Sequence, residues 1–271
     1  MKLGLEGKVA LVTGGGQGVG RQICIELAAE GARVIVNDLF AERAQAVAAE
    51  ITAAGGQALA APADITRAEE VEAMVAKGAA HFDAPVTVLV NNAGIIPERR
   101  EKGGRTPPFL DMPTVDWAKI VNLNVYGTMN CCRSVLPGMV ERKGGRIVNI
   151  ISEAGRIGEA NMAVYSGAKA AIAGFGKALA REHGRHAITV NSVALGAVSH
   201  AGIKDGPLNI HATPENDERL GKMLNVYPIS KGVGRLSRPE DISGLIAFLA
   251  SDRALFITGQ TIGASGGFAM V

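Results

Sequence analysis

Tyr165 and Lys169 are the two residues of this sequence whose types and spacing point most directly to chemistry. They are four residues apart in AVYSGAKAAIAGF, and Ser152 lies thirteen positions before Tyr165. On a helix, Tyr165 and Lys169 share one face. A phenol has a pKa of about 10, so acid–base work near neutral pH requires its anion to be favoured by about 3 units, or about 4 kcal/mol.

An ammonium group one helical turn away can supply that stabilisation. The Ser152 hydroxyl can hydrogen-bond the same substrate oxygen that the phenol protonates or deprotonates. These three residues therefore predict proton transfer at a substrate oxygen. The spacing alone is also compatible with an ordinary amphipathic helix that carries a surface lysine and a half-buried tyrosine. Other motifs in the chain distinguish this interpretation from a catalytic one.

A glycine cluster near the start of the chain predicts a phosphate-binding turn. The apolar run KVALVT at 8–13 leads into GGGQGVG and then into RQICIELAAEG, which reads as strand, turn and helix. Gly14, Gly18 and Gly20 lie where the strand must turn sharply and where a Cβ would block a pyrophosphate from the amino end of the helix. The spacing is GxxxGxG rather than GxGxxG.

Asp38 ends the next predicted strand, ARVIVND at 32–38. A carboxylate there can accept both hydrogen bonds of an adenosine ribose and would repel a 2′-phosphate. No Arg or Lys lies at 14–19 or immediately after Asp38, and Arg21 is the nearest basic residue. NAD is therefore favoured over NADP. A turn residue or a helix cap is the alternative interpretation of Asp38.

These residues resemble the classical short-chain dehydrogenases/reductases, over nearly the whole chain. The match includes TGGGQGVG at 13–20, Asp64 and Ile65 after the third strand, NNAG at 91–94, Asn124, Ser152, Tyr165, Lys169 and GQTI…GG at 259–267. The resemblance implies that Tyr165 is the general acid/base and that Ser152 orients the substrate oxygen. It implies that Lys169 lowers the tyrosine pKa and holds the nicotinamide ribose, and that Asn124 anchors a water in a proton relay.

The resemblance also implies a set of residues around the cofactor. Asp64 and Ile65 would bracket the adenine, and Asn91, Ala93 and Gly94 would line the cofactor wall. The full set comprises Gly14, Gln17, Gly18, Val19, Gly20, Asp38, Leu39, Asp64, Ile65, Asn91, Ala93, Gly94, Tyr165, Lys169, Gly196 and Val198.

The sequence departs from the family pattern after the sixth strand. Leu195-Gly196 stands where the family usually has Pro-Gly, and Ser199 and His200 stand near a threonine that contacts the carboxamide. Ser199 is the candidate replacement for the missing hydroxyl.

Strand-like and helix-like segments alternate along the chain, which predicts an α/β fold with a doubly wound, seven-stranded parallel sheet in a single domain, 1–271. The predicted strands are 8–13, 33–37, 57–61, 86–91, 146–151, 188–193 and 260–263. The predicted helices are 19–30, 41–54, 67–82, 114–141, 163–184 and 239–250. Two polar Gly/Pro-rich insertions, at about 97–113 and 200–228, are expected to shape the substrate site, the second as a lid with a helix near 215–224.

Composition agrees with a cytoplasmic enzyme. The net charge of +2 gives no reason to expect nucleic acid or an anionic membrane surface, and no apolar run is long enough for a membrane span. Cys24, Cys131 and Cys132 form no CxxC motif, so neither a metal nor a disulfide is expected. The long helices at 114–141 and 163–184 carry small apolar residues on more than one face, which favours packing against a partner; in the family these helices form homodimers and homotetramers.

The predicted activity is NAD-dependent interconversion of a secondary alcohol and a ketone by hydride transfer. A 3-hydroxyacyl-thioester dehydrogenase or 3-oxoacyl-thioester reductase is the alternative. Arg99, Arg100, Lys102 and Arg105 would suit a phosphate-bearing carrier, although acidic neighbours favour a solvated loop. A non-catalytic dinucleotide-binding scaffold is the second alternative. Smaller candidates are Glu153 as a second acid, a substrate contact or a solvated carboxylate, and His200 and His211 as substrate contacts or surface residues.

Overall fold

The protein is described by a computed structural model that covers residues 2–96 and 107–271. Its centre is a parallel sheet of seven strands in the order β3-β2-β1-β4-β5-β6-β7. The seven predicted strands are all present, with ends that differ from the prediction by at most two residues. They are β1 (Val9–Val12), β2 (Arg33–Val36), β3 (Gln57–Ala60), β4 (Val86–Asn91), β5 (Gly145–Ser152), β6 (Ile188–Leu195) and β7 (Thr261–Ala264).

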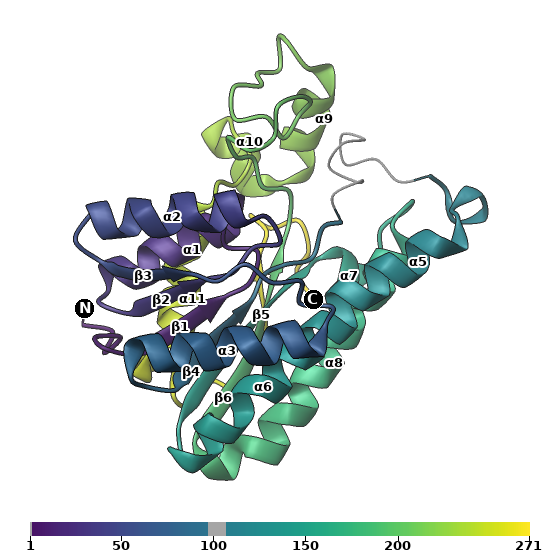
Figure 1. The fold of residues 1–271 in the computed structure, drawn as a ribbon. Coiled ribbons are helices and arrows are strands. Elements are labelled where there is room, and N and C mark those ends of the chain that lie inside the picture. The colour runs from purple at the N-terminus through teal and green to yellow at the C-terminus, as the bar shows by residue number, and fades with distance from the viewer. Residues whose placement is uncertain (1, 97–106) are drawn as a thin grey trace.

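Helices cover both faces of the sheet (Figure 1). One face packs against α1 (Gly18–Ala29), α2 (Ala41–Ala53) and α11 (Glu240–Ala250). The other face packs against α3 (Ala68–Phe82), α6 (Gly127–Glu141) and α8 (Ala163–His183), and α5 (Thr114–Val121) continues this layer. The architecture is the predicted doubly wound α/β fold, and it forms one domain.

Alternation along β1 shows why both faces need cover. Val9 and Leu11 belong to the core beneath α3 and α6, whereas Ala10 and Val12 belong to the core beneath α1 and α11. Successive strand side chains point to opposite faces, so a strand buried on both sides must be apolar throughout. The polar and glycine residues that follow β1, beginning with Thr13, therefore lie beyond the carboxyl end of the strand.

The predicted helix 114–141 is helical over its whole span, but its α-helical hydrogen bonding is interrupted, which the sequence did not indicate. After α5, residues Asn122–Tyr126 form a π-helical turn before α6 begins at Gly127. Asn124 lies inside this turn, its amide donates to the Ile120 carbonyl at 3.0 Å, and Thr128 donates to the Asn124 carbonyl at 2.8 Å. One inserted residue of this kind is commonly retained at functional sites because it re-aims a side chain.

The segment after β6 carries two helices, α9 (Glu218–Val226) and α10 (Pro228–Val233), which stand beyond the sheet in Figure 1. The helix expected near 215–224 corresponds to α9. A short α7 (Ala154–Ile157), which the sequence did not indicate, follows β5 directly. Of the first insertion, the structure describes only 107–113, with a 3-10 turn at Phe109–Asp111; residues 97–106, including the four basic ones, lie outside the described part.

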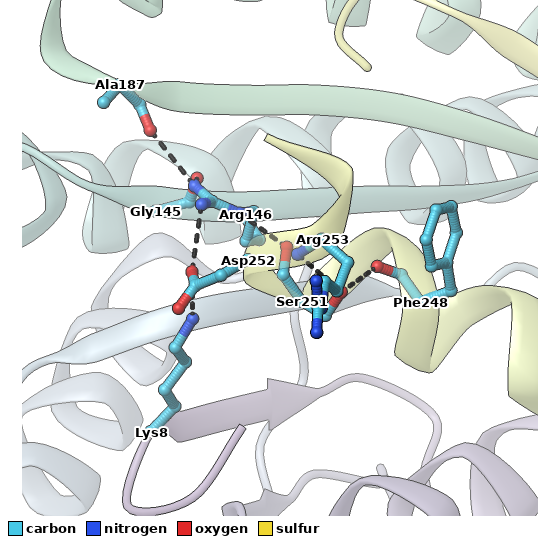
Figure 2. Close-up of polar contacts among 8 residues, drawn as sticks. All are labelled: Lys8, Gly145, Arg146, Ala187, Phe248, Ser251, Asp252 and Arg253. Carbon is cyan, nitrogen blue, oxygen red and sulfur yellow. Dashed lines mark hydrogen bonds and ion pairs between the residues drawn. The ribbon is translucent and has the colours of Figure 1, made fainter. Parts of the chain in front are cut away.

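At the amino end of β5, a buried guanidinium ties three chain segments together (Figure 2). Arg146 donates to the carbonyl oxygens of Ser251 and Ala187, both at 3.1 Å, and to Asp252 at 3.1 Å. Lys8 pairs with the same Asp252 carboxylate oxygen. Burial lowers the pKa of Arg146. This network holds the end of the sheet opposite to Ser152, which terminates the same strand.

Candidate active site

The carboxyl edge of the sheet holds a cavity of about 580 Å³. The cavity is lined by the glycine turn after β1, by residues that follow β2 and β4, and by Ser152, Tyr165 and Lys169. Strand order reverses between β1 and β4, and ligands of open α/β sheets bind at such a switch point. The fold therefore brings the predicted phosphate-binding turn and the predicted acid–base residues to one cavity.

The glycine turn has the conformation and the close contacts that require glycine. Gly14 and Gly18 have φ angles of +61° and +55°, in the left-handed region. A Cβ on Gly20 would overlap the Gly14 carbonyl oxygen and the Asn92 amide. No side chain of these glycines therefore covers the amino end of α1. An exposed helix amino end of this kind can bind an anionic phosphate group.

Asp38 follows β2, lies beside the glycine turn and is 6% exposed. Its two carboxylate oxygens accept hydrogen bonds from the backbone N–H groups of Gly16 and Phe40, both at 3.1 Å. These two bonds fix the carboxylate at the cavity wall, where a ribose would meet it. Both interpretations of Asp38 therefore apply. Its carboxylate accepts hydrogen bonds from two turn N–H groups, and the residue also lines the cavity.

Arg43 is a cavity residue that sequence reasoning missed. It lies on the first turn of α2, lines the cavity, and holds its guanidinium carbon 4.2 Å from the centroid of the Phe40 ring. Its position five residues after Asp38 hid it from a search limited to the immediate neighbours of that residue. Arg43 lies in the first turn of α2, which begins at the same edge of the sheet as Asp38. A search extended by one turn into this helix would have found it.

Tyr165 and Lys169 lie on α8, and both line the cavity. The Lys169 Nζ atom is 5.7 Å from the centroid of the Tyr165 ring and donates to the Ile150 carbonyl at 2.9 Å. Burial lowers the pKa of Lys169 to about 8. Ser152 ends β5 beside them, with its hydroxyl accepting from the Ala154 N–H at 3.2 Å. The site thus combines a phenol, a buried ammonium and a hydroxyl held by backbone.

Asn124 stands behind the cavity wall rather than in its lining. Its amide donates to the Gly94 carbonyl at 3.1 Å, and a Cβ on Gly94 would lie 2.6 Å from Lys169 Nζ and 2.8 Å from Asn124 Oδ1. That buried Oδ1 has no hydrogen-bond partner among the described residues. A buried acceptor in this state commonly binds an ordered water, and a water here would connect Asn124 with Lys169.

Most of the residues predicted around the cofactor line this cavity, and Asn91 is the exception. Asn91 is buried in the sheet and donates to Asn149 at 2.9 Å, whereas its neighbour Asn92 lines the cavity and donates to the Thr13 and Gly14 carbonyls. The predicted residues in the lining are Gly14, Gln17, Gly18, Val19, Gly20, Asp38, Leu39, Asp64, Ile65, Ala93, Gly94, Ser152, Tyr165, Lys169, Gly196 and Val198.

The end of the cavity beyond Ser152 is largely apolar. Tyr227 stacks on Phe268 with ring centroids 4.8 Å apart, and its hydroxyl accepts from the Ala197 N–H at 3.1 Å. Burial raises the pKa of Tyr227, with a further contribution from nearby carboxylates. Met162, Met223, Leu208 and Ile203 complete this end, together with Glu159.

Glu153 is not a solvated carboxylate, and it belongs to the cavity lining next to Ser152. Its side chain is 1% exposed and pairs with Arg156 at 3.0 Å. Both residues come from the short turn of α7 and its cap, so the pair is local. This local ion pair favours a structural role for Glu153.

After β6, His200 lines the cavity, as a substrate contact would, whereas Ser199 does not. The Ser199 hydroxyl faces the Ser237 carbonyl at 3.4 Å, and Ser199 is not in the cavity lining. His200 does line the cavity. His211 lies in a separate depression formed by the segment itself, away from Tyr165. The replacement for the family hydroxyl is therefore not Ser199.

Within the described residues, no helix has the length and apolar character needed to cross a membrane. The same part of the chain contains no group of three or more His, Cys, Asp or Glu side chains placed to hold a metal ion. Cys24, Cys131 and Cys132 are buried thiols, and burial raises the pKa of Cys132 to about 12. They have the environment of inert core residues.

Comparison with known proteins gives the same result as the geometry. The family model for short chain dehydrogenases matches residues 8–205. A dehydrogenase subunit of Thauera aromatica that acts on (R)-hydroxy(phenyl)methyl-succinyl-CoA is 38% identical over 98% of both chains. A 3-oxoacyl-acyl-carrier-protein reductase of Synechocystis is also 38% identical over 98% of both chains.

A solved structure of 7 alpha-hydroxysteroid dehydrogenase, in complex with NADH and 7-oxo glycochenodeoxycholic acid, superposes with a TM-score of 0.85 and 36% identity. The match covers 98% of this chain and 96% of that one. Sequence and fold therefore agree over almost the full length. The chain is an oxidoreductase that belongs to the short chain dehydrogenase family.

Proposed function

We propose that this protein oxidises a secondary alcohol to a ketone, or catalyses the reverse reduction, with NAD as its cofactor and Tyr165 as its general acid/base. The observation that carries the proposal is the meeting of Tyr165, Lys169 and Ser152 in the cavity that the glycine turn and Asp38 also line. A nicotinamide dinucleotide, when bound, supplies the hydride acceptor or donor. The bare backbone of the turn and the fixed Asp38 carboxylate fit the phosphates and the ribose of such a group.

Each protein group has a defined task in the oxidative direction. Ser152 donates a hydrogen bond to the substrate oxygen and keeps it within reach of the Tyr165 hydroxyl. Tyr165 takes the hydroxyl proton as the carbinol carbon is oxidised. Lys169, with Nζ 5.7 Å from the centroid of the Tyr165 ring, favours the phenolate, and it would also hold the sugar of the cofactor. Asn124 Oδ1, through a water, would complete the route by which the proton leaves.

The choice of NAD rests on Asp38. Its carboxylate is 6% exposed and lines the cavity, and a 2′-phosphate of a cofactor whose ribose bound beside Asp38 would meet a negative charge. Arg43 on the same wall is the opposing feature, because a guanidinium can bind a phosphate. Since two backbone N–H groups hold Asp38 in place, we infer that the carboxylate dominates and that NAD is preferred.

A thioester substrate is a second candidate, favoured by the names of two relatives: one acts on a CoA thioester and one on an acyl-carrier-protein thioester. The apolar end of the cavity can receive an acyl chain, and it can equally receive a free hydrophobic alcohol. The basic residues that would meet a carrier phosphate, Arg99, Arg100 and Arg105, lie outside the described residues. Their joint replacement by Ala therefore tests this candidate in solution.

The deciding experiment is a panel of oxidation and reduction assays with NAD(H) and NADP(H). The panel compares free secondary alcohols and ketones with 3-hydroxyacyl-CoA and 3-oxoacyl-CoA thioesters. Activity with NAD on any member supports the proposal. If the Arg99, Arg100 and Arg105 replacement lowers activity on CoA thioesters and leaves free alcohols unaffected, the thioester candidate is supported. Absence of turnover across the panel would favour a dinucleotide-binding scaffold.

We also infer a homotetramer, or a homodimer, and a cytoplasmic location. The exposed apolar side chains Val115 and Tyr126 lie on the α5 to α6 layer, where packing of two copies would cover them. Light scattering coupled to size-exclusion chromatography gives the number of chains in the assembly.

A further inference from the structure

A second depression, of about 230 Å³, lies apart from the active-site cavity, in the region after β6. Its walls come from residues 207–213 on one side and 234–238 on the other, and Ser199 and Leu220 complete it. Sites for drug-sized ligands usually measure about 300–1,000 Å³. The depression is therefore suited to a small ligand, or to one end of a larger one.

The charged residues that line this depression are basic. Arg235, Arg238 and His211 belong to the lining, and none of the described residues that line it is Asp or Glu. Arginine is always protonated, and even a neutral histidine ring carries one N–H donor. The walls therefore offer positive charge and hydrogen-bond donors, which is the environment that an anion requires.

The two arginines differ in how far their side chains are already paired. Arg235 donates to both carboxylate oxygens of Asp241, from Nη1 at 2.5 Å and from Nη2 at 2.9 Å. Arg238 reaches the same carboxylate through its backbone N–H, at 2.8 Å. Its Nε is buried and has no hydrogen-bond partner among the described residues. Since buried donors are nearly always paired, with protein, water or an ion, Arg238 is the arginine here that can receive a ligand.

The depression shares its walls with the active-site cavity. On α9, Leu220 lines the depression and Met223, about one turn later, lines the cavity. Leu208 also lines the cavity, whereas the residues on either side of it line the depression. A ligand bound to Arg238 would therefore join the segment after β6 to the chain that leads into α11.

We propose that this depression binds a phosphate group, with the Arg238 guanidinium as its main ligand and His211 as a further donor. A guanidinium can form two parallel, charge-assisted hydrogen bonds to phosphate oxygens. The group belongs either to inorganic phosphate or to a phosphate ester such as coenzyme A. The proposal concerns binding alone, so it is independent of the reaction proposed above.

The test is calorimetric titration of the whole protein with inorganic phosphate, in a buffer free of other oxyanions. Arg238→Gln should weaken phosphate binding by at least about tenfold, the effect of losing a hydrogen bond to a charged group. Lys231→Gln is the matched control, because it removes the same charge from an exposed position on α10 that lies outside the depression. It should change the affinity by less than about twofold, since exposed charges are screened by solvent.

Phosphate bound at the glycine turn does not contact Arg238, so the loss in Arg238→Gln isolates the depression. Phosphate should also raise the melting temperature of the wild type and of Lys231→Gln more than that of Arg238→Gln. Arg238→Lys keeps the charge and loses the paired geometry, so its affinity should fall between those of the wild type and Arg238→Gln. If Arg238→Gln does not fold, an affinity of Arg238→Lys equal to that of the wild type overturns the proposal.

Three other results would also overturn it: no phosphate binding by the wild type, equal affinity in folded Arg238→Gln, or an equal loss in Lys231→Gln. A titration with coenzyme A identifies the source of the group. Binding tighter than that of phosphate and weakened by Arg238→Gln assigns the site to a phosphate ester, whereas a response to phosphate alone assigns it to the free anion. Binding of NADH is measured separately, and its absence would count against the proposed function and not against this site.

Discussion

The Lys169 ammonium lies 5.7 Å from the centroid of the Tyr165 ring while its Nζ donates to the Ile150 carbonyl at 2.9 Å. The carbonyl fixes the lysine head group at the end of β5, and α8 fixes the tyrosine one turn away. Both side chains are therefore held in position before a substrate binds. The positive charge is held in a buried place, where it acts more strongly on a neighbouring phenol than it would in water.

Tyr165→Phe tests whether the phenol is the acid/base. The substitution keeps the ring and removes only its oxygen, so the fold and cofactor binding should survive. Turnover should fall by about two to four decades, the usual contribution of a positioned proton-transfer group. Steady-state kinetics and NADH titration measure the two quantities separately. A variant that binds NADH and turns over near the wild-type rate would contradict the mechanism.

Burial of Lys169 predicts a pH-dependent contribution to stability. Its pKa falls from 10.5 to about 8 on folding, so between these values the folded protein holds fewer protons than the unfolded chain. Stability from this group therefore rises with pH across that window, by at most about 1.4 kcal/mol per pH unit. Lys169→Met lacks the titrating group. Its free energy of unfolding, relative to the wild type, should decline between pH 7.5 and pH 9.5.

Denaturant unfolding at the two pH values gives the comparison. Lys177→Met is the control, because Lys177 is exposed on the same helix. A relative stability of Lys169→Met that does not change with pH would show that the lysine is not desolvated in the folded protein.

Gly94→Ala should damage turnover more than stability. The added methyl group would lie 2.6 Å from Lys169 Nζ and 2.8 Å from Asn124 Oδ1, so both polar ends must move. A displacement of about 1 Å in a catalytic group can lower the rate by about a hundredfold. The atoms that must yield are side-chain ends, so the melting temperature should change little. Gly174→Ala, an exposed site on α8 with no neighbour within 4 Å of the new Cβ, should leave the rate unchanged.

The sequence was sufficient to predict the sheet and much of the site. Strands such as Val9–Val12 and Arg33–Val36 are short runs rich in β-branched apolar residues, and these signals are local. The glycine turn, Asp38, Ser152 and the Tyr165–Lys169 pair stand at strand ends or one helical turn apart, so parallel strand order alone brings them together.

The features that escaped prediction depend on contacts that no local pattern encodes. The helical span around Asn124 is predictable, but its π turn is not, and the Asn124 amide in this turn donates to the carbonyl of Gly94, thirty residues earlier in the chain. Asn91 and Asn92 are adjacent amides, and only strand register decides that Asn91 enters the sheet while Asn92 faces the cavity. Glu153 is buried because Arg156 follows it on a turn that the sequence did not reveal.

Cofactor choice is predicted to favour NAD over NADP by at least about tenfold in kcat/KM, or about 1.4 kcal/mol. Asp38→Asn removes the charge and retains an oxygen that can accept a hydrogen bond, so the ratio should shrink. Arg43 would then be available to a 2′-phosphate, and adding Arg43→Gln to Asp38→Asn should reverse part of the gain in NADP use. Equal kcat/KM for both cofactors in the wild type would remove this role of Asp38.

The network around Arg146 is predicted to support stability and not activity. Its side chain is 7% exposed and donates to the Ser251 and Ala187 carbonyls as well as to Asp252. Arg146→Met would leave the two carbonyl acceptors without their donor, and a buried acceptor left unsatisfied costs about 1–3 kcal/mol. Asp252 is 61% exposed, so Asp252→Asn should cost less than about 1 kcal/mol.

Because Arg146 and Ser152 stand at opposite ends of β5, kcat and KM at 25 °C should stay near the wild-type values in both variants, while the denaturation midpoint falls clearly only in Arg146→Met. A loss of turnover in folded Arg146→Met would show instead that strain at the amino end of β5 reaches the hydroxyl at its carboxyl end.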